Sequence, residues 1–317
     1  MKIGAVGFGN RIAHIYFELK QINNEANLIS FVDPNPVGKK FAIENEIDFF
    51  DPYENKGLLR NLTIKITSTK NIMVLLQFGF KSDFIFKLLN FLKNSFENIN
   101  SILYVINMKP NDSIYDQKVN LFYGKDYITE KICGLRFKIT AKTFFQTNST
   151  QAEKLFYLVK KFLEPSKNDI LYDLYSGIGT IGQILSKDVK KVVGIDIVED
   201  SINYANENSK LNNLSNTKYF SGDMKDIFTE AFIKENGKPS VTIVNPPREG
   251  IDKKVIEKII DTKPKKIVYV SCNSSTLARD LFIFQKTYEI SKLQTIDMFP
   301  HTSHVENVVL LKKLIDV

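Results

Sequence analysis

From about residue 146 to the C-terminus, apolar runs of strand length alternate with amphipathic stretches of helical length. The runs ILYDLYS, KVVGIDIV, SVTIVNPP and KIVYVSC are each followed by a helical pattern. The chain then closes on two strand-like runs, ISKLQTIDMF and VENVVLLKKL, with no helix between them. Strands that alternate with helices are typical of a doubly wound sheet. The pattern predicts a Rossmann-like α/β domain whose last pair of strands is antiparallel.

Two further blocks precede this domain. Residues 1–55 have a β-α-β pattern, whereas residues 56–145 combine strand-like runs with one amphipathic stretch, SDFIFKLLNFLKNSF, and lack the regular alternation. The sequence therefore predicts a short β-α-β segment over 1–55, a smaller α+β domain over 56–145 and the α/β domain over 146–317. In the last of these, TQAE predicts a helix that begins near Thr150 with a capping box to Glu153.

Composition narrows the class of protein without naming it. The chain of 317 residues is 43% apolar and 25% charged, as in ordinary globular proteins. It contains no apolar run near the roughly 18 residues of a membrane span and no secretory pattern, so we expect a cytoplasmic protein without membrane contact. Two cysteines, Cys133 and Cys272, are too few for an iron–sulfur cluster, and none is expected. A net charge of +7 admits a polyanionic partner.

The first glycine-rich turn lies near the N-terminus. Gly7 and Gly9 follow a strand-like run, and Asp33 ends the next one. Residues 1–55 resemble the N-terminus of NAD(P)-dependent oxidoreductases of the glucose-fructose oxidoreductase/inositol dehydrogenase type. Ile12 occupies the place of the third small residue, and a lone turn of this kind is a weak signal. A truncated or fused remnant is the favoured interpretation, and an NAD(P)-dependent oxidoreductase is the alternative function.

The second glycine-rich turn, DLYSGIGT, follows a strand-like run that ends at Asp173 and Leu174. Gly177 and Gly179 permit a tight turn and a close approach of the backbone to a ligand, although a packing role for the glycines is the alternative. Asp196 ends the next strand-like run, where its carboxylate could accept hydrogen bonds from both ribose hydroxyls of a bound nucleoside. An acid before the glycines disfavours a pyrophosphate and favours a sulfonium. The turn therefore indicates S-adenosylmethionine as the cofactor.

Four longer motifs follow one another along the chain: FKITAKTFFQTNSTQAEKLF, VNPPREG, YVSCNSSTLARD and DMFPHTSHVENVVLL. From about residue 57 onward they resemble the RNA 5-methyluridine (uracil-C5) methyltransferase family. The resemblance implies a class I S-adenosylmethionine-dependent fold over 146–317 and methylation of uridine C5 in RNA. Because the region over 56–145 is more similar to the ribosomal-RNA branch, the expected partner is ribosomal RNA, contacted in part by 56–145, with no obligate protein partner.

Uracil C5 is too weak a nucleophile to attack a sulfonium methyl unaided, so this chemistry requires a thiolate that adds at C6 and a base that removes the C5 proton. Cys272 ends a strand-like run before a helical pattern and is the expected nucleophile; an inert, buried cysteine is the alternative, and Cys133 is taken as structural. Glu306 in an apolar strand is the expected base, since burial would raise its pKa, and a solvent-facing glutamate is the alternative. His301 and His304 are expected to shape the turn before Glu306 or to contact phosphate, rather than to act as bases.

The resemblance also implies a set of cofactor-binding residues. These are Gln146, Tyr175, Asp196 and Asn245. Gln146 could instead contact the uracil edge. At Asn245 the family has aspartate, and at Ser274 it has proline, so a catalytically silent RNA-binding relative is a further alternative. Arg248 and Arg279 could bind RNA phosphate or brace the site.

Overall fold

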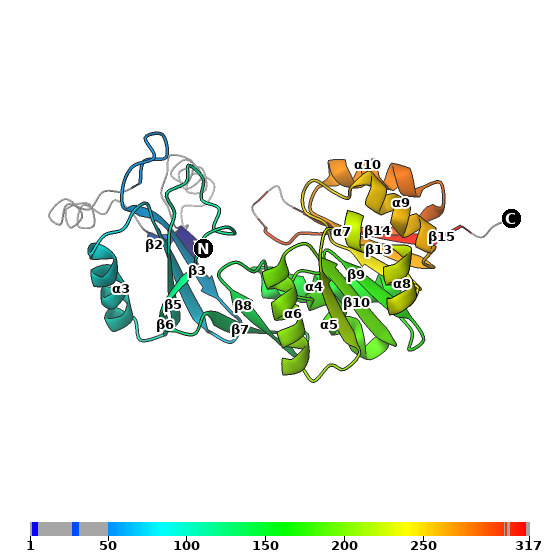
Figure 1. Ribbon diagram of the computed structural model, residues 1–317, viewed down its shortest axis with the longest axis horizontal. Coiled ribbons are helices and arrows are strands. Elements are labelled where there is room, and N and C mark those ends of the chain that lie inside the picture. The colour runs from blue at the N-terminus through cyan, green and yellow to red at the C-terminus, as the bar shows by residue number, and fades with distance from the viewer. Residues whose placement is uncertain (1, 6–26, 32–49, 301, 303–304, 315–317) are drawn as a thin grey trace. The chain divides into compact units, whose positions relative to one another are not determined.

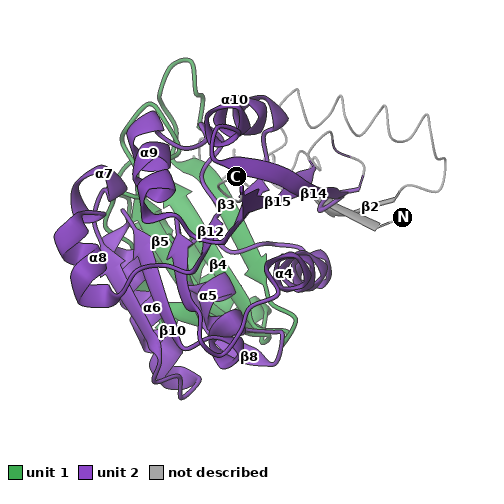
Figure 2. Cartoon of the chain, turned by 90° about the vertical axis from the view of Figure 1, so that its right-hand side faces the viewer, with its two compact units in different colours: residues 1–128, 140–142 green, residues 129–139, 143–317 purple. Residues whose placement is uncertain are grey.

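The chain forms two compact units, and each is described separately. The computed structural model describes residues 2–5, 27–31, 50–300, 302 and 305–314. Unit 1 comprises residues 1–128 and 140–142, and unit 2 comprises 129–139 and 143–317 (Figure 2). The three-domain division expected from the sequence stays a prediction. The glycine turn at Gly7 and Gly9, together with Asp33, lies outside the described residues.

Unit 2 is built on a seven-stranded sheet (Figure 1). In spatial order the strands are β11 (Thr217–Ser221), β10 (Lys191–Asp196), β9 (Ile170–Leu174), β12 (Val241–Val244), β13 (Lys266–Ser271), β15 (Glu306–Lys313) and β14 (Tyr288–Ile296). The first five are parallel, and β15 is antiparallel to both β13 and β14. The predicted doubly wound sheet with a closing antiparallel pair is confirmed, and the last strand in the sequence inserts between β13 and β14.

Helices pack on both faces of this sheet. The cluster on one face includes α4 (Ser149–Leu163), α5 (Thr180–Leu185) and α6 (Glu199–Leu211), with the 3-10 turn η1 (Ser186–Asp188) after α5. The cluster on the other includes α7 (Met224–Ile227), α8 (Glu230–Asn236), α9 (Lys253–Thr262) and α10 (Ser274–Phe284). Strand residues alternate between them: on β13, Val268 and Val270 join the first cluster, while Ile267 and Tyr269 join the second. Burial of apolar side chains on both faces stabilises the layered fold.

The start of α4 differs from the sequence prediction. Its N-cap is Asn148, whose side-chain oxygen accepts a hydrogen bond from Gln151 N at 3.1 Å. Glu153 accepts instead from the backbone N–H of Cys133 at 2.8 Å. The capping box expected between Thr150 and Glu153 is therefore wrong, because the asparagine before the helix takes the capping role. Cys133 lies between the strands of a two-stranded sheet, β7 (Tyr127–Ile132) and β8 (Leu135–Thr140).

Unit 1 contains a four-stranded sheet in the order β3-β4-β5-β6. Its elements are β3 (Leu59–Ile66), β4 (Ile72–Phe78), α3 (Phe84–Ser95), β5 (Ile99–Ile106) and β6 (Asn120–Gly124). Ile85 and Leu89 of α3 pack against Phe78 and Ile102 of the sheet. Two short strands, β1 (Lys2–Ala5) and β2 (Asn27–Phe31), pair in parallel. No helix in the described part of the chain is long and apolar enough to cross a membrane.

Candidate active site

The candidate site lies where the parallel strands of unit 2 end. The loop after β9 is bonded to the ends of both neighbouring strands. Asn245 N donates to Leu174 O at 3.2 Å, and Gly177 N donates to the Asp196 Oδ2 atom at 2.8 Å. Three of the sequence motifs therefore meet at the carboxyl ends of β9, β10 and β12, the edge at which doubly wound sheets bind ligands.

The glycines of the turn after β9 have different roles. A Cβ atom on Gly179 would lie 2.6 Å from the Tyr219 ring, and one on Gly182 would lie 2.8 Å from the Asp173 carboxylate. Both are therefore needed for packing, as the alternative interpretation of the turn expected. Gly177 has a φ of +53° and no atom within 4 Å of an added Cβ. Only this glycine leaves open space beside the backbone, as a cradle for a ligand requires.

Asp173 does not face the ligand side of the turn. Its side chain is 1% exposed, and its Oδ2 atom accepts a hydrogen bond from Gly182 N at 2.9 Å. Burial raises the pKa of this carboxyl to about 7, and the nearby charge of Asp196 adds to the effect. The carboxyl therefore braces the first turn of α5, and the expectation that Asp173 presents its charge directly to a sulfonium is wrong.

Asp196 and Tyr175 lie on the open side of the turn. The Asp196 Oδ1 atom accepts from Val198 N at 2.9 Å, while Oδ2 accepts from Gly177. Each carboxylate oxygen has lone-pair capacity for a further hydrogen bond. Tyr175 is half-buried and has a φ of +60°, a left-handed conformation that costs a non-glycine residue of order 1 kcal/mol or more. Such strain is typical of functional turns.

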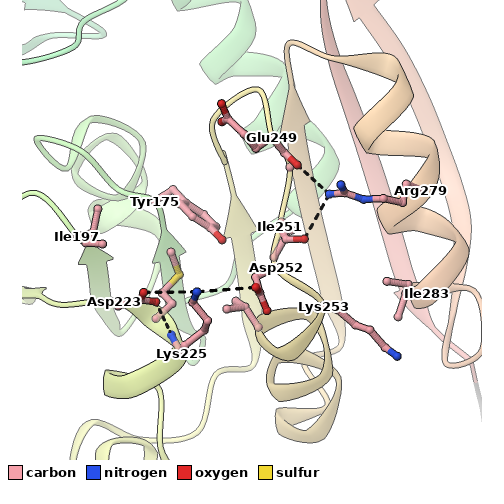
Figure 3. A pocket seen from close by; sticks show the side chains of 13 residues that line it. Tyr175, Ile197, Asp223, Lys225, Glu249, Ile251, Asp252, Lys253, Arg279 and Ile283 are labelled. Carbon is pink, nitrogen blue, oxygen red and sulfur yellow. Dashed lines mark hydrogen bonds and ion pairs between the residues drawn. The ribbon is translucent and has the colours of Figure 1, made fainter. Parts of the chain in front are cut away.

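A cavity of about 620 Å³ opens beside Tyr175 (Figure 3). Ile197 and Asp223 line it from the ends of β10 and β11, and Ile251 lines it from the loop before α9. Sequence reasoning missed Asp223, although the run TKYFSGD ends in an acid just as the run before it ends in Asp196. The Lys225 Nζ atom at the cavity lies 3.7 Å from the Asp223 carboxylate. One side of the cavity is therefore lined from the ends of three neighbouring strands, by Tyr175 after β9, Ile197 after β10 and Asp223 after β11.

Cys272 and Glu306 face one another across the antiparallel pair β13–β15. Ser271, the last residue of β13, is paired with Asn307, so the next facing positions are Cys272 and Glu306. Burial raises the pKa of the Cys272 thiol, and the charge of Glu306 raises it further, whereas the Arg248 guanidinium lowers it. Burial also raises the pKa of Glu306, to about 7. The arginine beside the thiol is Arg248.

Of the remaining expected residues, the structure describes Asn245 and Gln146 but not His301 and His304. The side chains of Asn245 and Gln146 are partly exposed and have no hydrogen-bond partner among the described residues. Gln146 lies in the loop before α4. His301 and His304 lie outside the described residues. Within the described ranges, no group of three or more His, Cys, Asp or Glu side chains is arranged to bind a metal ion.

Arg279 braces the loop after β12. Its Nη2 atom donates to Glu249 O at 2.8 Å and to Ile251 O at 3.4 Å, and its Nε atom donates to the carboxylate of Asp280 at 2.9 Å. Of the two roles that the sequence left open for this arginine, the structure shows the bracing role.

This seven-stranded sheet has the fold of Rossmann-like S-adenosylmethionine-dependent methyltransferases. Residues 114–314 match the model of the tRNA (uracil-5-)-methyltransferase family, and the chain belongs to that family. The resemblance seen in the motifs is thereby confirmed.

Relatives extend this result. An RNA methyltransferase of Bacteroides thetaiotaomicron, named as uncharacterized, is 43% identical over 278 residues, which are 86% of this chain and 61% of that protein. One from Streptococcus pyogenes serotype M1 is 38% identical over 305 residues, 95% of this chain and 64% of the relative. That match is longer than residues 56–317, so it includes part of 1–55. The chain spans about three fifths of the length of these relatives.

A solved structure shows the same architecture. The tRNA (uracil-54, C5)-methyltransferase of Pyrococcus abyssi, in complex with S-adenosyl-L-homocysteine, superimposes with a TM-score of 0.71 and 32% identity. The match covers 86% of this chain and 64% of that one.

Proposed function

We propose that this chain transfers a methyl group from S-adenosylmethionine to C5 of a uridine in RNA. The observation that supports it most is the pair of Cys272 and Glu306 at facing positions of β13 and β15. C5 methylation requires a nucleophile and a base, and the Cys272 thiol and the Glu306 carboxyl, whose pKa is about 7, are groups of these two kinds. Family membership and the ligand of the Pyrococcus abyssi enzyme agree with this assignment.

The residues at the carboxyl edge of the sheet fit S-adenosylmethionine. The open side of Gly177 admits a ligand against the backbone, and Asp196 has acceptor capacity for ribose hydroxyls. The amides of Asn245 and Gln146 lack internal partners among the described residues and can bind polar groups of the ligand. Together with Tyr175, which lines the cavity, these residues would form the cofactor site. When bound, the cofactor supplies an electrophilic methyl group on a sulfonium.

Asp223 and Ile197 extend this site. Both line the cavity beside Tyr175: Ile197 follows β10, and Asp223 follows β11. An apolar side chain next to a carboxylate suits a flat heterocycle with an amino group. We therefore assign the adenine end of the cofactor to this part of the cavity.

The chain's own groups carry out the proton and covalent steps. The Cys272 thiolate adds to C6 of the uridine, which forms an S–C6 bond and moves an electron pair to C5, the atom that takes the methyl group. The Glu306 carboxylate then accepts the C5 proton. The electrons of that C–H bond restore the C5–C6 double bond, and the S–C6 bond breaks to release Cys272 as a thiolate. Arg248 favours the thiolate at the start and at the end of this cycle.

The substrate must expose C6 of the target base to Cys272, so the uridine is unpaired or flipped out of its helix. Ribosomal RNA is the substrate expected from the sequence of 56–145, whereas the Pyrococcus abyssi enzyme is a tRNA (uracil-54, C5)-methyltransferase. We keep ribosomal RNA as the proposed substrate, and the test below compares both.

The proposal is tested with labelled S-adenosylmethionine and unmodified transcripts of ribosomal RNA and tRNA. Nucleoside analysis should find labelled 5-methyluridine, with the ribosomal transcript preferred. Cys272→Ser should abolish the product, and Cys133→Ser, the matched control at the other cysteine, should retain it. Product formation that survives Cys272→Ser would contradict the proposed mechanism. A preference for the tRNA transcript would overturn only the substrate.

A further inference from the structure

Asp280 on α10 is a fully buried carboxylate that the proposed chemistry does not use. Its side chain is 0% exposed, and its Oδ2 atom accepts hydrogen bonds from Ile251 N at 2.8 Å and from the Tyr269 hydroxyl at 2.7 Å. Ile251 lies in the loop between β12 and α9, and Tyr269 lies in β13. A single carboxylate therefore joins α10 to the strand that leads to Cys272 and to the loop that contains Arg248.

The other carboxylate oxygen of Asp280 is also engaged. Its Oδ1 atom accepts a hydrogen bond from the Nε atom of Arg279 at 2.9 Å, and the Nη2 atom of the same guanidinium forms an ion pair with it at 2.8 Å. The same Nη2 atom donates to Glu249 O. Arg279 thus offsets the charge of Asp280 and adds a second connection to the loop. The Asp280 side chain is fully buried, whereas that of Arg279 is 54% exposed, so loss of Arg279 would leave a buried charge without its cationic partner.

The first turn of α10 makes two more bonds to the same loop. The Nδ2 atom of Asn273 and the Oγ1 atom of Thr276 donate to Arg248 O at 3.0 and 3.1 Å. Gly250 has a φ of +77°, and a Cβ atom there would lie 2.6 Å from the Asp280 Oδ2 atom. The loop therefore lies directly against α10, with no room for a side chain between them.

We propose that Asp280 is a positioning residue that fixes the loop 248–251 against α10, so that the Arg248 guanidinium stays beside the Cys272 thiol. Cys272 directly precedes the N-cap of α10, Asn273, and it is therefore attached to the same helix to which the loop is bonded. The loop is therefore hydrogen-bonded to the helix that directly follows Cys272. An effect of Asp280 on methyl transfer rests on the proposed function. Its effect on the position of Arg248 relative to Cys272 does not.

A role limited to stability is the competing explanation, and the chain offers a matched control. Asp169 is 8% exposed at the opposite end of the sheet, just before β9. Its carboxylate likewise accepts from a backbone N–H, that of Ser166 at 2.8 Å, and from a hydroxyl, that of Ser240 at 2.8 Å. Asp169→Asn therefore removes a comparable buried charge far from the loop, and it should lower stability without moving Arg248.

The test measures alkylation of Cys272 by iodoacetamide as a function of pH, with the modified Cys272 peptide quantified by mass spectrometry so that Cys133 does not contribute. The groups that face the thiol are Arg248 from the loop, Glu306 from β15 and the N-terminus of α10. With Arg248 displaced and Glu306 unmoved, Asp280→Asn should raise the apparent thiol pKa by about one unit and slow alkylation near neutral pH about tenfold.

Asp169→Asn should leave this profile unchanged. Thr276→Val, which removes one bond to Arg248 O, should shift the profile in the same direction by a smaller amount, and it decides the matter if Asp280→Asn does not fold. A profile unchanged in every loop variant that folds, or shifted equally by Asp169→Asn, overturns the proposal. Methyl transfer is assayed in parallel: an inactive wild type whose alkylation still responds to Asp280→Asn would refute the proposed function and leave the positioning role intact.

Discussion

Cys272 and Glu306 occupy facing positions at the end of the β13–β15 pair, one step beyond the paired residues Ser271 and Asn307. The carboxylate raises the pKa of the thiol, and burial raises the pKa of Glu306 to about 7. The two groups therefore oppose each other when both are ionised. In the proposed reaction they act in sequence, because the thiolate is needed at C6 before the carboxylate is needed at C5.

This opposition predicts two separable effects of Glu306→Gln. Loss of the negative charge lowers the thiol pKa, so alkylation of Cys272 at about pH 8 should become severalfold faster. Methyl transfer should fall by a factor of about 10² or more, since no base removes the C5 proton. Because release of Cys272 requires that proton transfer, a protein–RNA adduct should accumulate on ordinary uridine RNA and be visible on a denaturing gel. Unchanged methyl transfer would contradict the role of Glu306.

The cofactor turn predicts that Gly177→Ala affects binding more than stability. Gly177 has a φ of +53°, and its best control is Gly134, which has a φ of +79° and likewise no atom within 4 Å of an added Cβ. Both alanine variants should lose about 1 kcal/mol of folding stability from backbone strain. Only Gly177→Ala should weaken S-adenosylhomocysteine binding, by about tenfold or more in calorimetry. Equal affinities in the two variants would remove this turn from the cofactor site.

Asn245, where the family has aspartate, gives a test that uses the charge of the cofactor. Its side chain has no partner in the described chain, so Asn245→Asp adds a carboxylate without breaking a hydrogen bond. A carboxylate near the sulfonium should tighten binding of S-adenosylmethionine by about threefold to tenfold. S-adenosylhomocysteine, which lacks the positive charge, should gain less. Equal gains for both ligands would show that position 245 does not lie near the sulfonium.

Asp173 predicts a pH dependence of stability that is independent of catalysis. Its pKa is about 7 in the folded protein against an ordinary value of 3.8, so folding favours the protonated form. This contribution is fully present below the lower pKa and is lost as the pH rises through the higher one. Relative to Asp173→Asn, the wild type should lose about 2–3 kcal/mol of unfolding free energy between pH 5 and pH 8. Denaturant unfolding at both pH values measures the difference, and parallel curves would refute the raised pKa.

Sequence periodicity was sufficient for the architecture of unit 2. Alternating runs predicted the layered sheet, and the helix-free ending predicted an antiparallel pair, because these features depend on local patterns. Insertion of β15 between β13 and β14 could not be read from the sequence, since pairing partners depend on contacts between distant segments. The start of α4 was misjudged for the same reason, because Glu153 accepts a hydrogen bond from Cys133 N in the turn between β7 and β8, a contact with another segment of the chain.

The candidate site was predicted residue by residue, and its environment was not. Cys272 and Glu306 came from motifs, but only the register of β13 and β15 brings them together. The burial of Asp173 could not be foreseen. Side chains alternate between the two faces of a strand, and the sequence alone does not show whether Asp173 points toward α5 or toward the ligand. Arg248 was a candidate from its motif, but its position beside Cys272 and the burial of Asp280 depend on loop packing, for which a single sequence contains no signal.

The central claim is that Cys272 bonds covalently to C6 of a uridine in RNA, and a mechanism-based trap tests it most directly. Fluorine at C5 cannot leave as a proton does, so RNA that contains 5-fluorouridine should remain attached after the methyl group has been transferred. With labelled S-adenosylmethionine, we predict a denaturation-resistant labelled adduct whose RNA is attached to the Cys272 peptide. It should be absent in Cys272→Ala and present in Cys133→Ser. An adduct at another residue, or no adduct from a protein that methylates uridine, would contradict the account.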